Sequence, residues 1–134
     1  MSKEEEMQKL AVQYQVLQAN VRLIEERQQF LLKHLEELQR TKAAIEELEH
    51  TKIGDAFVPV GNGNFLFGSV SDTNNVIVGI GGGIAIKKTR KDAVEILEGR
   101  LREMNKILSE LAVDGERIFS QMNNIQKKAD EFQK

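Results

Sequence analysis

The side chains best suited to acid–base or metal chemistry are two histidines, and their spacing serves neither purpose. His34 and His50 lie sixteen residues apart, so neither has a partner at the i, i+4 spacing that places two ligands on one helical face. The glutamate pairs are adjacent in sequence and point to different faces of a helix, which suits the charged flanks of a coiled coil better than an acid–base dyad. These pairs are Glu25–Glu26, Glu36–Glu37 and Glu46–Glu47.

Nucleophilic and nucleotide-binding motifs are also absent from the sequence. There is no cysteine, and none of the five serines has a base near it in sequence. The run from Gly79 to Gly83 contains a G-x-G, but it lacks the third glycine of a dinucleotide fingerprint, and we expect a strand rather than a helix after it. A hairpin turn is the better explanation. We therefore expect no catalytic residue, no cofactor and no metal.

Length and charge narrow the class of protein further. The chain has 134 residues, a net charge of −2 and 5% aromatic residues with no tryptophan, which disfavours a dense globular core. Acidic and basic residues are evenly spread, so no concentrated positive surface is available for nucleic acid or an anionic membrane. No apolar run approaches the roughly 20 residues that span a bilayer, and the N-terminus is acidic rather than signal-like. We predict a cytoplasmic protein that binds neither nucleic acid nor membrane.

Two long heptad patterns dominate the sequence, one before and one after a glycine-rich centre. The first helix is expected from about Lys3 to His50, and the second from near Asp92, as its N-cap, to about Phe132. The patterns predict an antiparallel coiled coil, with Ile45 opposite Val94, and Tyr14 opposite Ile125. A register shifted by one heptad satisfies the same pattern and stays open. The seam residues of the first helix are Leu10, Leu17, Ile24, Leu31, Leu38 and Ile45, together with Met7, Tyr14, Val21, Gln28, Leu35 and Lys42. Those of the second are Val94, Leu97, Leu101, Met104, Leu108, Leu111, Gly115, Ile118, Met122, Ile125, Ala129 and Phe132.

Gly115 interrupts the apolar seam of the second helix. A glycine in a helix interior costs about 1 kcal/mol relative to alanine, and at a seam it leaves a hole. Beyond it the chain carries methionine and aromatic residues, including Phe119, which lies off the seam. Two interpretations stay open. Either these residues complete the coiled coil, or this end frays and exposes an adaptable apolar surface.

The glycine-rich centre predicts four short strands in two β-hairpins. Two hairpins cannot bury their own apolar faces, so we expect their edges to pair with other chains. The fold class is therefore α+β, a long antiparallel two-helix coiled coil with two β-hairpins at the connecting end. The strands are expected at 57–60, 64–70, 76–80 and 84–88, and the segments of the chain are 1–52 for the first helix, 53–90 for the hairpins and 91–134 for the second helix.

The central segment also resembles a known family. The chain resembles the prefoldin alpha subunit of archaea, and the resemblance covers essentially the whole chain. The residues that carry it are Val58-Pro59-Val60-Gly61, the following Phe65, and the stretch from Val76 to Lys88. The double hairpin matches the alpha type, whereas beta-type subunits carry a single hairpin. The resemblance implies an ATP-independent chaperone, a holdase, that captures unfolded client proteins with its coiled-coil tips and delivers them to a group II chaperonin. It also implies a hexamer of two alpha and four beta subunits, whose hairpins join an intersubunit β-barrel.

Two groups of site residues follow from the resemblance. The client-binding tips are expected at Met7, Leu10, Tyr14, Leu17, Ile118, Phe119, Met122, Ile125 and Phe132. The oligomerisation residues are expected at Phe57, Val58, Val60, Phe65, Phe67, Val70, Val76, Val78, Ile80, Ile84 and Ile86. The alternative function is a non-catalytic oligomeric coiled-coil scaffold or spacer whose ends bind one defined partner.

Overall fold

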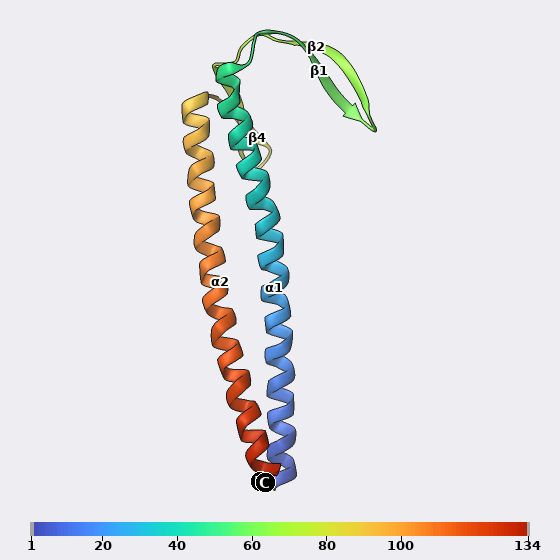
Figure 1. Cartoon of the computed structure of the whole chain (residues 1–134), viewed down its shortest axis with the longest axis vertical. Helices are drawn as coiled ribbons and strands as arrows, with labels where there is room; N and C mark the ends of the chain where they lie inside the picture. The colour runs from blue at the N-terminus through green and yellow to red at the C-terminus, as the bar shows by residue number, and fades with distance from the viewer. Residues whose placement is uncertain (1, 134) are drawn as a thin grey trace. The chain divides into compact units, whose positions relative to one another are not determined.

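The computed structural model describes residues 2–133 and divides into two compact units. The terminal unit contains the residues up to Leu35 and those from Glu103 onward, and the hairpin unit contains Glu36–Arg102. The elements are shown in Figure 1. In chain order they are α1 (Lys3–Glu47), the short 3-10 turn η1 (Leu48–His50), β1 (Gly54–Gly61), β2 (Asn64–Val70), β3 (Asn75–Gly81), β4 (Ile84–Thr89) and α2 (Arg90–Gln133).

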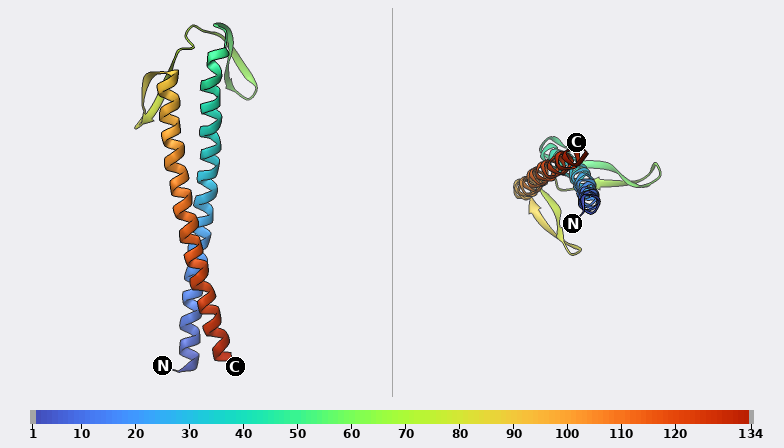
Figure 2. Two further views of the ribbon diagram at one scale, coloured as in Figure 1. Left: turned by 60° about the vertical axis from the view of Figure 1, so that its left-hand side comes forward. Right: turned by 90° about the horizontal axis from the view of Figure 1, so that it is seen from below.

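The predicted heptad seam is the surface through which the helices pack. In both units, every seam position of α1 and α2 is buried or half-buried, whereas most residues between them are exposed. The α1 and α2 segments of each unit run antiparallel (Figure 2). In the hairpin unit Ile45 and Val94 line the same groove, and in the terminal unit Tyr14 and Ile125 do so. These pairs agree with the predicted register, so the coiled-coil prediction is confirmed.

Each long helix begins at a hydroxyl cap. The Ser2 Oγ accepts a hydrogen bond from the Glu5 backbone N–H at 3.2 Å, and the Thr89 Oγ1 accepts one from the Asp92 N–H at 3.1 Å. The prediction that Asp92 is the N-cap of the second helix is therefore wrong. Asp92 lies in the first turn instead, where its carboxylate interacts favourably with the helix dipole.

The four strands form two separate antiparallel hairpins, as predicted. Hairpin one is β1–β2 and hairpin two is β3–β4. Both turns have two central residues with positive φ, 49° and 78° at Asn62 and Gly63, and 61° and 74° at Gly82 and Gly83. This is the type I′ geometry, which follows the twist of the strands and strongly favours Asn-Gly and Gly-Gly. The pairing register shifts beside each turn.

Gly115 does not interrupt α2. The helix runs without a break from Arg90 to Gln133, and a Cβ added at Gly115 would meet no atom within 4 Å. The glycine thus leaves space at the seam, as the sequence suggested, without ending the helix. Within residues 2–133, no helix combines the length and the apolar character needed to cross a membrane.

Candidate functional site

Hairpin one presents apolar side chains on both of its faces. Phe57 pairs directly with Phe67 across the strands, and the ring of Phe57 lies 5.6 Å from that of Phe67 and 6.3 Å from that of Phe65. Since side chains alternate along a strand, these rings share one face, while Val58 and Leu66 lie on the other. All five side chains are exposed, and Phe67 reaches 91% exposure. Hairpin one therefore offers two uncovered apolar faces.

Hairpin two is held against the beginning of α2. The Arg100 Nη2 donates a hydrogen bond of 2.6 Å to the backbone oxygen of Gly79, and the Arg90 N–H donates one of 3.0 Å to the oxygen of Asn74. Val78, next to Gly79, is only 6% exposed. Figure 2 shows this hairpin beside the first turns of α2. One face of hairpin two is therefore partly covered by its own chain.

The predicted oligomerisation residues consequently fall into two groups. Those with exposed side chains, available to another chain, are Phe57, Val58, Val60, Phe65, Phe67, Ile80 and Ile84. Val70, Val76 and Ile86 are half-buried. Val78 does not fit the oligomerisation role predicted for it, because its side chain is already buried within this chain. There it stabilises the packing of hairpin two against the rest of the chain.

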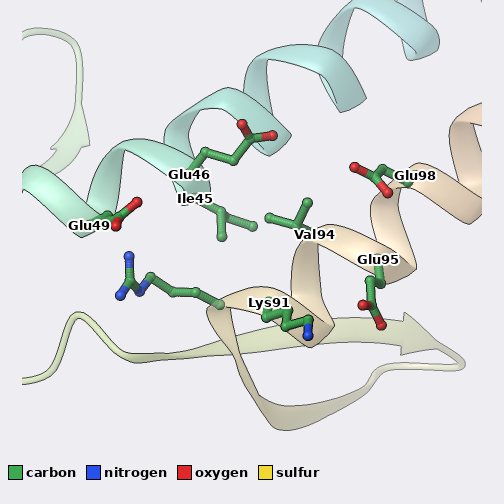
Figure 3. Close-up of a pocket in the computed structure, with 8 residues that line it drawn as sticks. Ile45, Glu46, Glu49, Lys91, Val94, Glu95 and Glu98 are labelled. Atoms are coloured by element: carbon green, nitrogen blue, oxygen red, sulfur yellow. The ribbon is translucent and has the colours of Figure 1, made fainter.

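A charged groove of about 500 Å³ lies between the ends of the helices in the hairpin unit. Figure 3 shows Ile45 and Val94 pointing toward each other at its floor. The surrounding side chains are almost all charged, and Lys42 Nζ lies 3.3 Å from Glu98 Oε1. Partly exposed ion pairs of this kind contribute little to stability but help to set register. The charged lining residues are Glu46, Glu49, Arg90, Lys91, Glu95 and Glu98.

The terminal unit has grooves of a different chemistry on the two sides of Ile125. One, of about 330 Å³, has a floor that includes Met7, Leu10 and Tyr14. The other, of about 470 Å³, is lined by Val12, Val16 and Leu17 of α1. The rims consist of amide side chains and one charge, Lys128. These amides are Gln13, Gln15, Gln18, Gln121, Asn124 and Gln126.

The predicted tip residues lie in this unit, but most of them belong to the closed seam. Met122 is 8% exposed and is therefore covered. Phe119 is 51% exposed, as its off-seam position implied. The remaining tip residues are half-buried, namely Met7, Leu10, Tyr14, Leu17, Ile118, Ile125 and Phe132. The structure thus shows these residues completing the coiled coil, the first of the two interpretations, rather than a frayed end.

The sequence interpretation missed an apolar stripe on the outer side of α1. Val12, Val16, Leu23 and Phe30 are between 55% and 71% exposed. The last three repeat every seven residues, as the seam does, but at a heptad position two residues beyond Met7, Tyr14 and their equivalents. A search for sevenfold repeats outside the two seam positions would have found them.

Among residues 2–133, no three His, Cys, Asp or Glu side chains are grouped closely enough to hold a metal ion. One carboxyl has a clearly altered titration. A hydrogen bond from the Asn75 side-chain amide, followed by one from the Asn74 backbone N–H, lowers the pKa of Asp72 below its ordinary value of 3.8. This carboxylate organises the turn between the hairpins.

Two antiparallel helices that flank a pair of apolar hairpins define a class of coiled-coil subunits. Comparison with known proteins identifies the class. The family model "Prefoldin subunit" matches residues 17–134. The chain therefore belongs to the prefoldin family, as an alpha-type chaperone subunit, and the matched family is not a catalytic one.

Relatives agree with this assignment, and a solved structure has the same fold. The chain is 31% identical to prefoldin subunit alpha of Pyrococcus horikoshii over 130 residues, which cover 96% of this chain and 88% of the relative. It is 37% identical to prefoldin subunit alpha 1 of Thermococcus kodakarensis over 98 residues, covering 72% and 67%. The fold matches a cryo-EM structure of filamentous PFD from Methanocaldococcus jannaschii with a TM-score of 0.67, at 17% identity, covering 92% and 97%.

Proposed function

We propose that this chain is the alpha subunit of an ATP-independent holdase that captures unfolded proteins and delivers them to a group II chaperonin. The observation that carries the proposal is the chemistry of the terminal grooves, which have apolar floors and amide rims. Amide side chains both donate and accept hydrogen bonds, so they suit the backbone of an unfolded polypeptide of any sequence. Apolar floors supply affinity for its exposed hydrophobic side chains.

Assembly with other subunits is the second part of the proposal. Prefoldin beta subunits are the proposed partners, two alpha with four beta, and the hairpins would complete an intersubunit β-barrel. The uncovered faces of hairpin one support this, because a two-stranded hairpin with apolar side chains on both faces is unstable in water. A cytoplasmic location is proposed with it, since client and chaperonin would be met there.

The test is light scattering of a chemically unfolded protein diluted into buffer without ATP. Suppression of scattering by a complex of this chain with a beta-type subunit is the expected result. In that complex, Val12→Ser combined with Val16→Ser should weaken suppression, because both residues line a terminal groove. Val113→Ser is the matched control, since Val113 is equally exposed and does not line these grooves. No suppression by a verified complex would overturn the proposal.

A passive oligomeric spacer is the second candidate, and the closed seam favours it. With Met122 and Leu111 buried, the helix pair of the terminal unit is complete without a client. Removal of residues 1–14 and 119–134 separates the two candidates. A holdase would still assemble but would lose suppression for unrelated clients, whereas a spacer has no general suppression to lose.

A further inference from the structure

The outer stripe of α1, defined as Val12, Val16, Leu23 and Phe30, is exposed apolar surface that the coiled coil does not use. At 100° per residue its members fall within about 40° of the helix circumference, so they form one narrow line. The line runs for about 27 Å at 1.5 Å per residue, within the terminal unit. Val12 and Val16 also line the larger terminal groove, so the stripe begins at that groove.

The spacing of the stripe distinguishes between helical and extended partners. Val16, Leu23 and Phe30 repeat every seven residues, which is about 10.5 Å along a helix axis. A partner helix with apolar residues at heptad spacing repeats at the same interval and can meet all three of these residues. An extended strand presents side chains on one face every 6.8 Å or so, and therefore falls out of step within one repeat.

The charges beside the stripe specify one flank of the partner. On the side that faces the groove, the residues of α1 from Lys9 onward are Lys9, Gln13, Asn20 and Arg27, and none of these four is acidic. Glu6 lies on the same side but before the stripe begins. Across the groove, α2 adds Lys128. A helix lying on the stripe would therefore be favoured if it carried acidic residues along this flank.

We infer that the outer stripe docks an amphipathic α-helix with apolar residues at heptad spacing and acidic residues along one flank. This inference rests on the proposed function, because the helix would belong to a client that retains helical structure. It adds partly folded chains that carry such a helix to the unfolded chains of the proposed function. The amide-rimmed grooves would take extended segments, and the stripe would take helices.

The experiment uses the assembled complex and fluorescence anisotropy of labelled synthetic peptides. The first peptide is an amphipathic helix with leucine at heptad positions and glutamate on one flank. The second has the same composition with leucine at every second position, which favours a strand. A third replaces the glutamates by lysines. Stronger binding of the first peptide than of the other two is expected.

The variants locate the binding surface. Leu23→Ser combined with Phe30→Ser should weaken binding of the helical peptide by about tenfold or more, since both are large apolar anchors. Leu32→Ser is the control, because Leu32 is also exposed on α1 but lies about 160° from Val16 around the helix. Lys128→Glu should weaken binding of the acidic peptide and not of the basic one. All of these positions are at the surface, and circular dichroism verifies that each variant remains helical.

Equal binding of the helical and strand-like peptides, or equal losses at Leu23 and Leu32, would overturn the inference. A change in the mass of the complex on substitution of Leu23 and Phe30 would also overturn it, because a second copy of a subunit would then occupy the stripe. Aggregation suppression is measured on the same samples. If suppression persists without a preference for the helical peptide, only this inference fails, whereas loss of both in the unmodified complex means that the proposed function fails.

Discussion

Hairpins one and two have the same local chemistry and different surroundings. Each has a type I′ turn and a register shift beside it, and each is rich in β-branched or aromatic residues. In hairpin two, Val78 is buried and Arg100 of α2 binds the backbone of Gly79. In hairpin one, the ring contacts found within residues 2–133 join Phe57 to Phe65 and to Phe67, all in the same hairpin. Phe57 and Phe67 both stay exposed.

The difference shows that a hairpin's shape and its availability have separate origins. Turn residues such as Asn62-Gly63 determine that a hairpin forms and in which register. A contact with a distant part of the chain determines whether one of its faces is already covered. Hairpin two therefore has one face left for a partner, whereas hairpin one has two. The following substitutions test this distinction, beginning with the largest effect.

Val78→Asp should separate hairpin two from α2. A carboxylate placed at a buried position with no partner has a destabilising effect of about 3 kcal/mol or more. The free energy of unfolding of the isolated chain, from urea titration, measures this effect. Ile77→Asp is the matched control, because Ile77 is the adjacent residue in β3 but is 77% exposed, and it should change stability little. Equal losses at the two positions would show that the faces of hairpin two are equivalent.

Phe67→Ser should have the opposite profile, with assembly lost and chain stability kept. Because the ring is 91% exposed, its removal leaves no cavity in the isolated chain. If a partner covers it, the substitution should weaken assembly by about 2 kcal/mol, which is roughly a thirtyfold increase in the dissociation constant. Analytical ultracentrifugation of the chain mixed with a beta-type subunit measures the change. Val113→Ser, an exposed apolar residue of the terminal unit, should leave assembly intact.

Much of the fold follows from local periodicity, and the rest depends on long-range contacts. The sevenfold repeat predicts the seam of both helices, and Asn62-Gly63 and Gly82-Gly83 predict the hairpin turns. The burial of Val78 is not predictable in this way, because it depends on how hairpin two packs against the rest of the chain. The bond from Arg100 to the Gly79 oxygen, which joins residues 21 positions apart, is equally unpredictable from local pattern. The choice of Thr89 over Asp92 as N-cap depends on where β4 ends, which propensity does not determine.

The candidate site was predicted only at the level of its region. The sequence indicated that the terminal end of the helices carries apolar surface, but it assigned that surface to seam residues such as Met122, which pack within the coiled coil. The exposed residues Val16, Leu23 and Phe30 form a third sevenfold repeat, which the two seam positions do not include. A side chain of α1 is exposed when it lies on a face that α2 does not cover, and the seam identifies only the covered face.

Arg100→Ala should loosen hairpin two by a smaller amount than Val78→Asp. The substitution removes one hydrogen bond to the Gly79 oxygen and leaves Val78 in place, so the expected effect is about 1 kcal/mol. Amide hydrogen exchange reports it locally. Exchange in β3 and β4 should become faster, while exchange in β1 and β2 should not change. Arg102→Ala is the control, since Arg102 is exposed two residues further along α2. Faster exchange in both hairpins would show that they are not independently anchored.

The smallest effect concerns the turn that joins the two hairpins. The Asp72 Oδ1 accepts hydrogen bonds from the N–H groups of Asn74 and Asn75, at 2.8 and 3.2 Å, and the Asn74 oxygen accepts one from the N–H of Arg90. A hydrogen bond from the Asn75 side-chain amide to Asp72 Oδ2, followed by the backbone N–H bond from Asn74, favours the charged carboxylate, so the pKa of Asp72 in the folded chain lies below its ordinary value of 3.8. Its stabilising contribution is therefore present above that value and is lost as the pH falls through the lowered pKa.

Asp72→Asn should accordingly reduce stability at neutral pH and reduce its dependence on pH under acidic conditions. Urea midpoints measured from neutral pH down to about pH 3 should converge for the variant and the unmodified chain as the carboxylate is protonated. Asp55→Asn removes the same charge from β1 and serves as the control. Hydrogen exchange at low pH then distinguishes the hairpins, because the start of β3 should open before β1, which does not depend on this turn. Simultaneous opening of β1 and β3 would mean that Asp72 stabilises the whole hairpin unit rather than only the start of hairpin two.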